Sequence, residues 1–301
     1  MVLINQDILA EITTYLDDDP STLHSLMLTS RTFCRIAVPL AYKNPFRFIS
    51  TAHLDRKHSL ICTYLTCLSA SEKKYFIKTV KIIKDSKPMF NYASYLEQLD
   101  CLVVYGILAT SRMPCYQWRR LEKMFRILFG LLIAGSKRLK GLNFVGHYLM
   151  NSTIQVEPPR GLRSIKIRSP RAHNEWIHSL IAHQNNLINF EIWYADDEIL
   201  NILGCLATQR SSLRRISFVH CTFIPCDQFR ILLNDLERLK EVQFKVFPFD
   251  SRRFQDLMIV LRESMEIRES TTDRVEFIPR GNGEREMTVV VEKMSAWSSS
   301  D

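Results

Sequence analysis

The 301-residue chain lacks several features that mark nucleotide-binding enzymes and membrane proteins. It contains only nine glycines, and none of them belongs to a phosphate-binding loop or a dinucleotide fingerprint. Its longest apolar block, ILFGLLIA at 127–134, falls far short of the roughly 20 residues that cross a bilayer. The N-terminus has no basic stretch followed by an apolar one, so we expect no secretion signal and no membrane partner.

The eight cysteines have neither the spacing of a zinc site nor that of a disulfide framework. Cys221 and Cys226 lie close together, as do Cys62 and Cys67, but no C-x-x-C or H-x-x-x-H motif accompanies either pair. His173, His178 and His183 recur every five residues, which turns successive side chains about 140° apart on a helix. We therefore expect reduced thiols in the cytoplasm or the nucleus, no metal and no cofactor. No nucleophile motif occurs, which indicates a protein that is not an enzyme.

Charge is unevenly distributed along the chain. The net charge is +8, yet residues 1–50 hold four Lys and Arg against five Asp and Glu, a net −1 that leaves +9 for the remainder. A basic body can attract acidic partners or nucleic acid. Because no run of five or more basic residues occurs, the sequence favours ordinary solvated side chains, and nucleic acid is not expected as a partner.

What the chain does contain is a repeat: an apolar residue, two others, an apolar residue, one other, and a third apolar residue. The segments RLKGLNF, GLRSIKI, NNLINFEI, SSLRRISF and RLKEVQF carry it. Their leading leucines are 23, 25, 26 and 26 residues apart: Leu139, Leu162, Leu187, Leu213 and Leu239. A near-constant period of this size is typical of a solenoid.

Helical patterns lie between the repeated segments, with apolar residues every three or four positions at 174–184, 196–207, 226–236 and 252–261. Each repeat is therefore expected to be one short strand and one helix, with parallel strands and the helices on the opposite side. The pattern resembles the leucine-rich-repeat family over roughly residues 137–265. The family's Asn or Cys at the ninth repeat position appears only as Cys221, and its place is taken elsewhere by His147, Pro170, Ala195 and Phe247.

Strand alternation predicts which repeat residues a partner would meet. The fourth and sixth residues of the pattern point into the core, and their neighbours point outward onto the concave face. The candidate substrate-binding residues are Lys166, Arg168, Glu191, Trp193 and Arg215. An outward tryptophan beside an arginine is a recognisable binding anchor. Alternatively, Trp193 packs under a loop or against the helix side.

The first 47 residues do not share the repeat. INQDILAEITTYL predicts an amphipathic helix with Asn5 as its N-cap. A second helix follows with Asp19 as cap and Pro20 at its first position, and Ser30 caps a third that ends near Pro39. Three such short helices bury little surface and are marginal unless they dock on something.

This N-terminal stretch resembles an F-box. The family's opening Leu-Pro matches Ile4 and Asn5, its Leu-x-x-Ile core matches Leu9 and Ile12, and its Leu-x-x-Leu-x-Leu-x-Ser-Arg segment begins at Leu23. The family has tryptophans where this chain has Phe33 and Tyr42. An F-box followed by leucine-rich repeats is the organisation of fungal-type F-box proteins.

The resemblance implies an α/β fold, with a three-helix F-box followed by a leucine-rich-repeat-like solenoid of concave strands and convex helices. It implies a Skp-type adaptor as partner, a cullin reached through that adaptor, and a protein substrate on the repeats of a ubiquitin ligase receptor. The implied adaptor-binding residues are Ile4, Ile8, Leu9, Ile12, Leu16, Leu23, Leu26, Leu28 and Phe33. A repeat scaffold whose degenerate F-box is not linked to a ligase is the alternative.

The expected domains are an F-box at 1–47, a helical linker at 48–70, a solenoid at 71–265, and a C-terminal strand cap with a disordered tail at 266–301. In the cap, Val275 and Phe277, and then Met287, Val289 and Val291, alternate with period two. This alternation predicts a hairpin or two edge strands.

Overall fold

The computed structural model describes residues 5–47, 54–76, 87–110, 118–146, 156–170, 175–195, 200–221, 235–246, 258–259, 262, 265–270, 274–279 and 288–293. The chain divides into two compact units. Unit 1 comprises residues 1–140 with 155–157, and unit 2 comprises residues 141–154 with 158–301. The boundary between them falls inside the range predicted as repeats.

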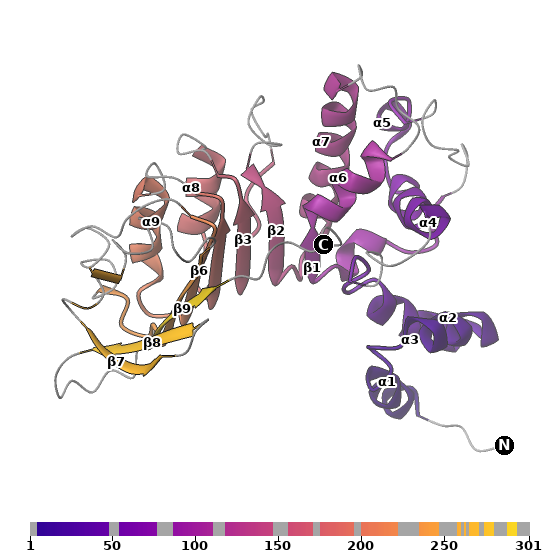
Figure 1. Ribbon diagram of the computed structural model, residues 1–301. Coiled ribbons are helices and arrows are strands. Elements are labelled where there is room, and N and C mark those ends of the chain that lie inside the picture. The colour runs from indigo at the N-terminus through magenta and orange to yellow at the C-terminus, as the bar shows by residue number, and fades with distance from the viewer. Residues whose placement is uncertain are drawn as a thin grey trace. The chain divides into compact units, whose positions relative to one another are not determined.

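Unit 1 is mainly helical (Figure 1). Its elements are α1 (Gln6–Thr14), α2 (Pro20–Thr29), α3 (Arg31–Ala41), α4 (Leu54–Leu65), α5 (Ala70–Lys73), the 3₁₀ turn η1 (Tyr92–Tyr95), the short strand β1 (Gln98–Asp100), α6 (Cys101–Ala109) and α7 (Trp118–Gly135). The core includes the fully buried Tyr64, Leu65, Phe125, Leu128 and Phe129.

Side-chain caps fix the starts of the first three helices, as the sequence predicts. Asn5 accepts a hydrogen bond from the N–H of Asp7 (3.0 Å), and Ser30 accepts one from the N–H of Phe33 (3.2 Å). Asp19 accepts from two N–H groups at the start of α2. The third helix does not stop at Pro39, because α3 continues to Ala41 with the proline inside its last turn.

Unit 2 is built on one sheet with the strand order β2-β3-β4-β5-β6-β9-β8-β7. The strands are β2 (Gly141–Val145), β3 (Ser164–Arg168), β4 (Asn189–Trp193), β5 (Arg215–Val219), β6 (Glu241–Val246), β7 (Met265–Ser270), β8 (Arg274–Pro279) and β9 (Thr288–Lys293). From β2 to β9 in this order every pairing is parallel. The last two pairings, β9 with β8 and β8 with β7, are antiparallel.

The five repeated segments form β2 to β6 in the predicted register. Their fourth and sixth residues make two buried rows across the sheet. The first row is Leu142, Ile165, Phe190, Ile216 and Val242, and the second is Phe144, Ile167, Ile192, Phe218 and Phe244. The parallel α/β arrangement expected from the repeat period is therefore confirmed.

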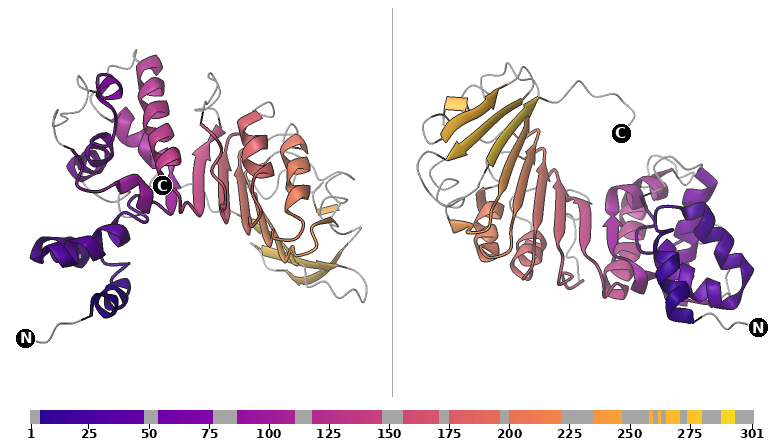
Figure 2. Two further views of the ribbon diagram at one scale, coloured as in Figure 1. Left: turned by 180° about the vertical axis from the view of Figure 1, so that it is seen from behind. Right: turned by 90° about the horizontal axis from the view of Figure 1, so that it is seen from below.

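Helices α8 (Glu175–Ala182) and α9 (Leu200–Leu206), with the short turn η4 (Ala207–Gln209), cover one face of the sheet (Figure 2). The indole of Trp176 on α8 meets the ring of Phe144 edge to face, with 5.7 Å between the ring centroids. Trp176, Ile177, Leu180 and Ile181 are all buried. We call the opposite face of the sheet the open face.

Two buried glutamines tie successive repeats together, and they lie just before the leading leucines Leu187 and Leu213, not at the ninth repeat position. The side-chain amide of Gln184 donates to the backbone carbonyls of Pro159 (2.8 Å) and Leu180 (2.6 Å), and its side-chain oxygen accepts from the N–H of Leu162 (2.9 Å). The side-chain amide of Gln209, one repeat later, donates to the backbone carbonyl of Gln184 (2.6 Å). Because buried backbone groups need partners, these side-chain amides stabilise the contact between neighbouring repeats.

The prediction of a leucine-rich-repeat solenoid is wrong: the strands form an open sheet. Helices follow β3 and β4, and the described residues 235, 258–259 and 262, after β5 and β6, are helical as well, but the sheet ends in antiparallel strands instead of a further coil. A solenoid requires the same closed coil at every step. This chain lacks the recurrent turn residue, with Pro170 and Ala195 at two of its places.

The C-terminal alternation does form two antiparallel strands, β8 and β9. However, β9 is not an edge strand, because it also pairs in parallel with β6 along its whole length. Strand β7, at the edge, was not predicted.

The helices predicted at 226–236 and 252–261 lie largely outside the described residues, as do Ile4, His147, His173, Cys226, Phe247, Met287 and the tail from 294. In the part that the structure describes, no helix is both long and apolar enough to cross a membrane.

Candidate functional site

Four of the five predicted substrate-binding residues form one cluster on the open face. Lys166 and Arg168 come from β3, and Glu191 and Trp193 from β4. The register places Lys166 beside Glu191 and Arg168 beside Trp193. We call these four residues the Trp193 cluster.

The tryptophan ring in this cluster is held by two cations. The ammonium nitrogen of Lys166 lies 4.4 Å from the ring centroid, and the guanidinium carbon of Arg168 lies 4.5 Å from it. The indole N–H donates to the carboxylate of Glu191, which also forms an ion pair with Lys166 (2.7 Å). Each cation–π contact at a partly exposed site is worth about 0.5–1 kcal/mol. The half-buried indole is thus fixed by its neighbours on the sheet face and does not pack against the helices.

Arg215, the fifth predicted residue, lies elsewhere on the same face. It pairs with Glu241 at 2.7 Å and stands in the first outward row of the sheet, beside Asn189. Further along β5, Ser217 and Val219 are 5% and 1% exposed although they point the same way. Over β3 and β4, in contrast, the residues of the Trp193 cluster are only half-buried, as are Gln243 and Lys245 on β6.

Two ring residues that the sequence reasoning missed extend this cluster. Tyr194 and His220 each follow directly after a strand, and both have positive φ angles, 54° and 53°. Their rings stack at 5.3 Å with 5° between the planes, and the ring of His220 lies 6.3 Å from that of Trp193. Non-glycine residues with positive φ are uncommon. The signal that could have found them is their shared place in the repeat, one residue past each strand, where Ser169 (φ 46°) also lies.

Burial sets the protonation of this end of the cluster. Desolvation lowers the pKa of His220, so its imidazole is neutral at pH 7. Arg168 Nε is buried and has no hydrogen-bond acceptor among the described residues. The Trp193 cluster, extended by Tyr194 and His220, presents two cations, one carboxylate and three rings, and such groups can hold a partner.

The second candidate surface is on helix α1 and the turn that follows it, where residues 8–16 divide between an inner and an outer face. Leu9, Thr13 and Leu16 face inward, and Thr13 is buried. Ile8 and Ile12 point outward and are 53% and 56% exposed, and Tyr15 on the same side is 82% exposed. At 100° per residue the outward three span about 60° of the helix circumference.

The remaining predicted adaptor residues are also divided. Leu28 at the end of α2 is 75% exposed, whereas Leu23 is fully buried and belongs to the core of unit 1. Leu26 and Phe33 are half-buried. The structure thus brings Ile8, Ile12 and Leu28 to the surface and places Leu23 inside.

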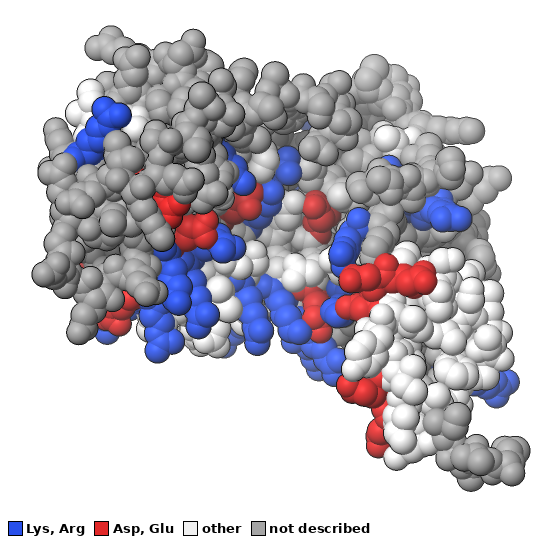
Figure 3. Space-filling view, turned by 60° about the horizontal axis from the view of Figure 1, so that its bottom comes forward, with Lys and Arg blue, Asp and Glu red and all other residues white. Residues whose placement is uncertain are grey.

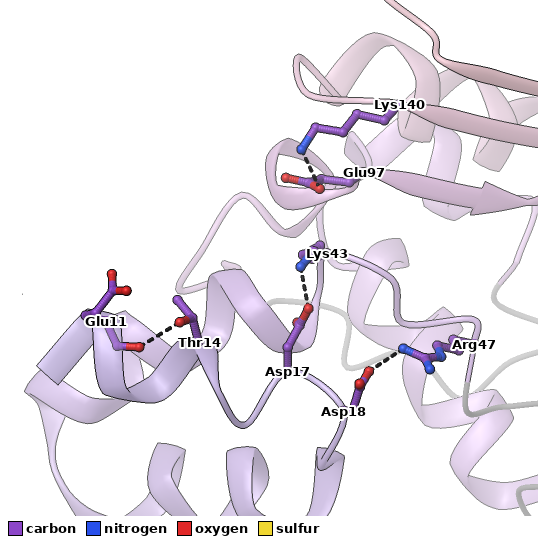
Figure 4. A network of polar contacts seen from close by, with 8 residues as sticks. All are labelled: Glu11, Thr14, Asp17, Asp18, Lys43, Arg47, Glu97 and Lys140. Atoms are coloured by element: carbon purple, nitrogen blue, oxygen red, sulfur yellow. Dashed lines mark hydrogen bonds and ion pairs between the residues drawn. The ribbon is translucent and has the colours of Figure 1, made fainter. Parts of the chain in front are cut away.

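The loop between α1 and α2 is anchored by ion pairs (Figure 4). Asp17 pairs with Lys43, and Asp18 pairs with Arg47. The carbonyl of Lys43 in turn accepts hydrogen bonds from the N–H groups of Glu97 (2.8 Å) and Gln98 (3.2 Å). These contacts connect the first three helices to the rest of unit 1. Thr22 and the backbone hydrogen bonds of the α2 cap lower the pKa of Asp19.

No group of three or more His, Cys, Asp or Glu that could hold a metal occurs among the described residues. Burial raises the pKa of Cys101 and raises that of Cys221 to about 12, so both thiols stay protonated. Cys205 Sγ lies 3.4 Å from His178 Nδ1, a pair that the sequence did not indicate, but burial raises the pKa of this thiol too.

Comparison of the chain with models of protein families, with curated proteins and with solved structures finds no match for it.

Proposed function

We propose that the protein is the substrate-recognition subunit of a Skp–cullin–F-box ubiquitin ligase. In this proposal α1 to α3 dock on a Skp-type adaptor, which binds the cullin, and the open face of unit 2 holds a protein substrate. The chain itself contributes no chemistry to ubiquitin transfer. The resemblance of residues 4–46 to an F-box supplies the identity of the adaptor.

The observation that carries the proposal is the concentration of exposed apolar side chains in α1 and α2. The described residues include eight large hydrophobic side chains that are exposed, and four of them are Ile8, Ile12, Tyr15 and Leu28. Single exposed apolar residues are ordinary, but a group rimmed by polar side chains is typical of an interaction site. Three of the four are residues through which an F-box would touch its adaptor.

The Trp193 cluster supports the substrate half of the proposal. Aromatic and arginine side chains are the residues that most often dominate binding energy at protein interfaces. Here the indole and both cations are already held in place by their mutual contacts, so little side-chain freedom remains to be lost on binding.

A second candidate is a repeat scaffold whose F-box does not recruit the ligase. Tyr42, at a position where the F-box family has tryptophan, favours it. This side chain packs inward against Tyr64 and Tyr92, with ring centroids 6.0 and 4.6 Å away, and burial raises its pKa. It is therefore committed to the core of unit 1 and offers little to a partner.

Affinity purification of the full chain from cells, with mass spectrometry of what co-purifies, separates the two candidates. A ligase receptor brings down adaptor and cullin together, and Ile8→Asp/Ile12→Asp removes both while the substrate remains. If the protein is a scaffold, proteins that bind unit 2 co-purify with it and the cullin does not. Cullin recovery that the double substitution does not change would refute the assignment of α1 as the docking helix.

A further inference from the structure

A row of basic residues lies along the amino-terminal edge of the parallel sheet in unit 2. Arg163, Arg214 and Lys240 each come directly before a strand, namely β3, β5 and β6. All three side chains are exposed. Figure 3 shows Lys and Arg side chains gathered in a band along this edge.

The backbone fixes these positions in line. The carbonyl of Arg163 accepts from the N–H of Ile188 (2.8 Å), whose carbonyl accepts from the N–H of Arg214 (2.9 Å). The carbonyl of Arg214 then accepts from the N–H of Lys240 (2.8 Å). The ladder of the sheet thus continues through the residues that carry the cations, so their spacing follows from the strand separation.

The loops that lead into the strands add to the charge of this edge. Together the edge holds seven basic residues: Arg160, Arg163, Arg210, Arg214, Arg215, Arg238 and Lys240. It holds three acidic ones, Asp235, Glu237 and Glu241, which leaves a net charge of +4. Arg215 is paired with Glu241, but none of the other six forms an ion pair within the described part of the chain. A row of solvated cations without carboxylate partners attracts an anionic ligand.

The dimensions of the row suit an extended polypeptide. Neighbouring strands lie about 4.8 Å apart, and β4 stands between β3 and β5, so the row from Arg163 to Lys240 is about 14 Å long. In an extended chain every second side chain points the same way, at intervals of about 6.8 Å. Three alternate acidic residues therefore span the same length as the three cations. Arginine also binds carboxylates in a two-point geometry.

Nucleic acid fits the edge less well. The segments 159–164, 209–215 and 235–241 contain no aromatic residue, so bases would find no ring on which to stack. Duplex DNA carries one charge per roughly 1.7 Å of its axis, and the three carboxylates on the edge oppose so dense a charge. A net charge of +4 suits a segment with a few carboxylates.

We propose that the amino-terminal edge of the unit 2 sheet binds an acidic, extended segment of a protein partner. The inference deepens the proposed function and rests on it in one respect, that unit 2 holds a protein. It adds a second contact for that protein, distinct from the Trp193 cluster, and it specifies the chemistry that the partner must offer.

The test is fluorescence anisotropy of the full chain with three labelled probes of defined composition. The first is a peptide in which six glutamates alternate with serine, the second has glutamine in place of glutamate, and the third is an oligothymidylate with six phosphates. The glutamate peptide is expected to bind more tightly than the other two. The substitutions Arg163→Glu/Arg214→Glu should weaken its binding about tenfold or more. Both side chains are exposed, so the fold is expected to tolerate them.

The matched control is Arg31→Glu/Arg35→Glu, which makes the same change of charge on two exposed residues of α3. It should change peptide affinity less than twofold. Equal weakening by the control, tighter binding of the oligothymidylate, or no binding of the glutamate peptide would each overturn the inference. Adaptor binding, measured with the unsubstituted chain of the same preparation, depends in the proposed function on α1 to α3 and not on unit 2. A chain that binds adaptor but not the peptide therefore refutes only this inference, and the reverse result refutes only the ligase role.

Discussion

Truncating the two exposed isoleucines of α1 should weaken adaptor binding by an amount that the structure sets. Complete burial of an isoleucine side chain is worth about 1.5–3 kcal/mol relative to full exposure. Ile8 and Ile12 are 53% and 56% exposed, so roughly half of that free energy remains available to a partner. For Ile8→Ala/Ile12→Ala we therefore expect a loss of about 2 kcal/mol, which is roughly thirtyfold in Kd.

The assay is isothermal titration of the purified full chain with a purified Skp-type adaptor. Ile259→Ala is the matched control, because this isoleucine is 57% exposed but lies in unit 2. The control should leave Kd unchanged. Thermal unfolding of the double variant should match that of the parent, since neither side chain belongs to the core. A double variant that binds as tightly as the control would refute the reasoning that this face docks the adaptor.

Three further predictions concern unit 2. Gln184→Ala should lower the free energy of unfolding by about 2–4 kcal/mol in denaturant titration, because it leaves the Leu162 N–H and the Pro159 carbonyl buried without partners. A change under about 1 kcal/mol would show that water replaces the side-chain amide. Trp193→Ala should cost about 2 kcal/mol of stability, because packing and two cation–π contacts are lost. It should also weaken substrate binding about tenfold or more, and unchanged binding would mean that the substrate binds elsewhere. Burial depresses the pKa of His220 in the folded state. Its contribution to stability is therefore complete above the unfolded pKa of about 6.5 and is lost as pH falls through the folded value. Between pH 7 and pH 5 the parent should lose more free energy of unfolding than His220→Asn, and parallel plots of that free energy against pH would contradict this.

The repeat could be read from the sequence because each strand buries two residues at fixed positions. Leu142 and Phe144, and their counterparts in the four later strands, made both the strands and their register predictable. The caps at Asn5, Asp19 and Ser30 were predictable for a similar reason, since a short polar side chain before an apolar helical pattern has few other roles.

What the sequence did not predict depends on contacts between distant residues. The open sheet follows from the insertion of β9 beside β6, a pairing between segments more than 40 residues apart in which both strands are rich in valine. The division of α1 into an inner and an outer face depends on which side meets α3, and amphipathicity alone grouped Leu9 with Ile8 and Ile12. Likewise, alternation placed Trp193 on the open face but could not show that Lys166 and Arg168 both lie over its ring.

Hydrogen–deuterium exchange of the full chain, with and without a Skp-type adaptor, tests most directly whether α1 and α2 form the adaptor-docking surface. The account predicts that the adaptor slows exchange in peptides covering residues 6–14 and 20–29, while peptides of β3 and β4 remain unchanged. Absence of protection in both helices, or protection confined to the sheet of unit 2, would contradict it.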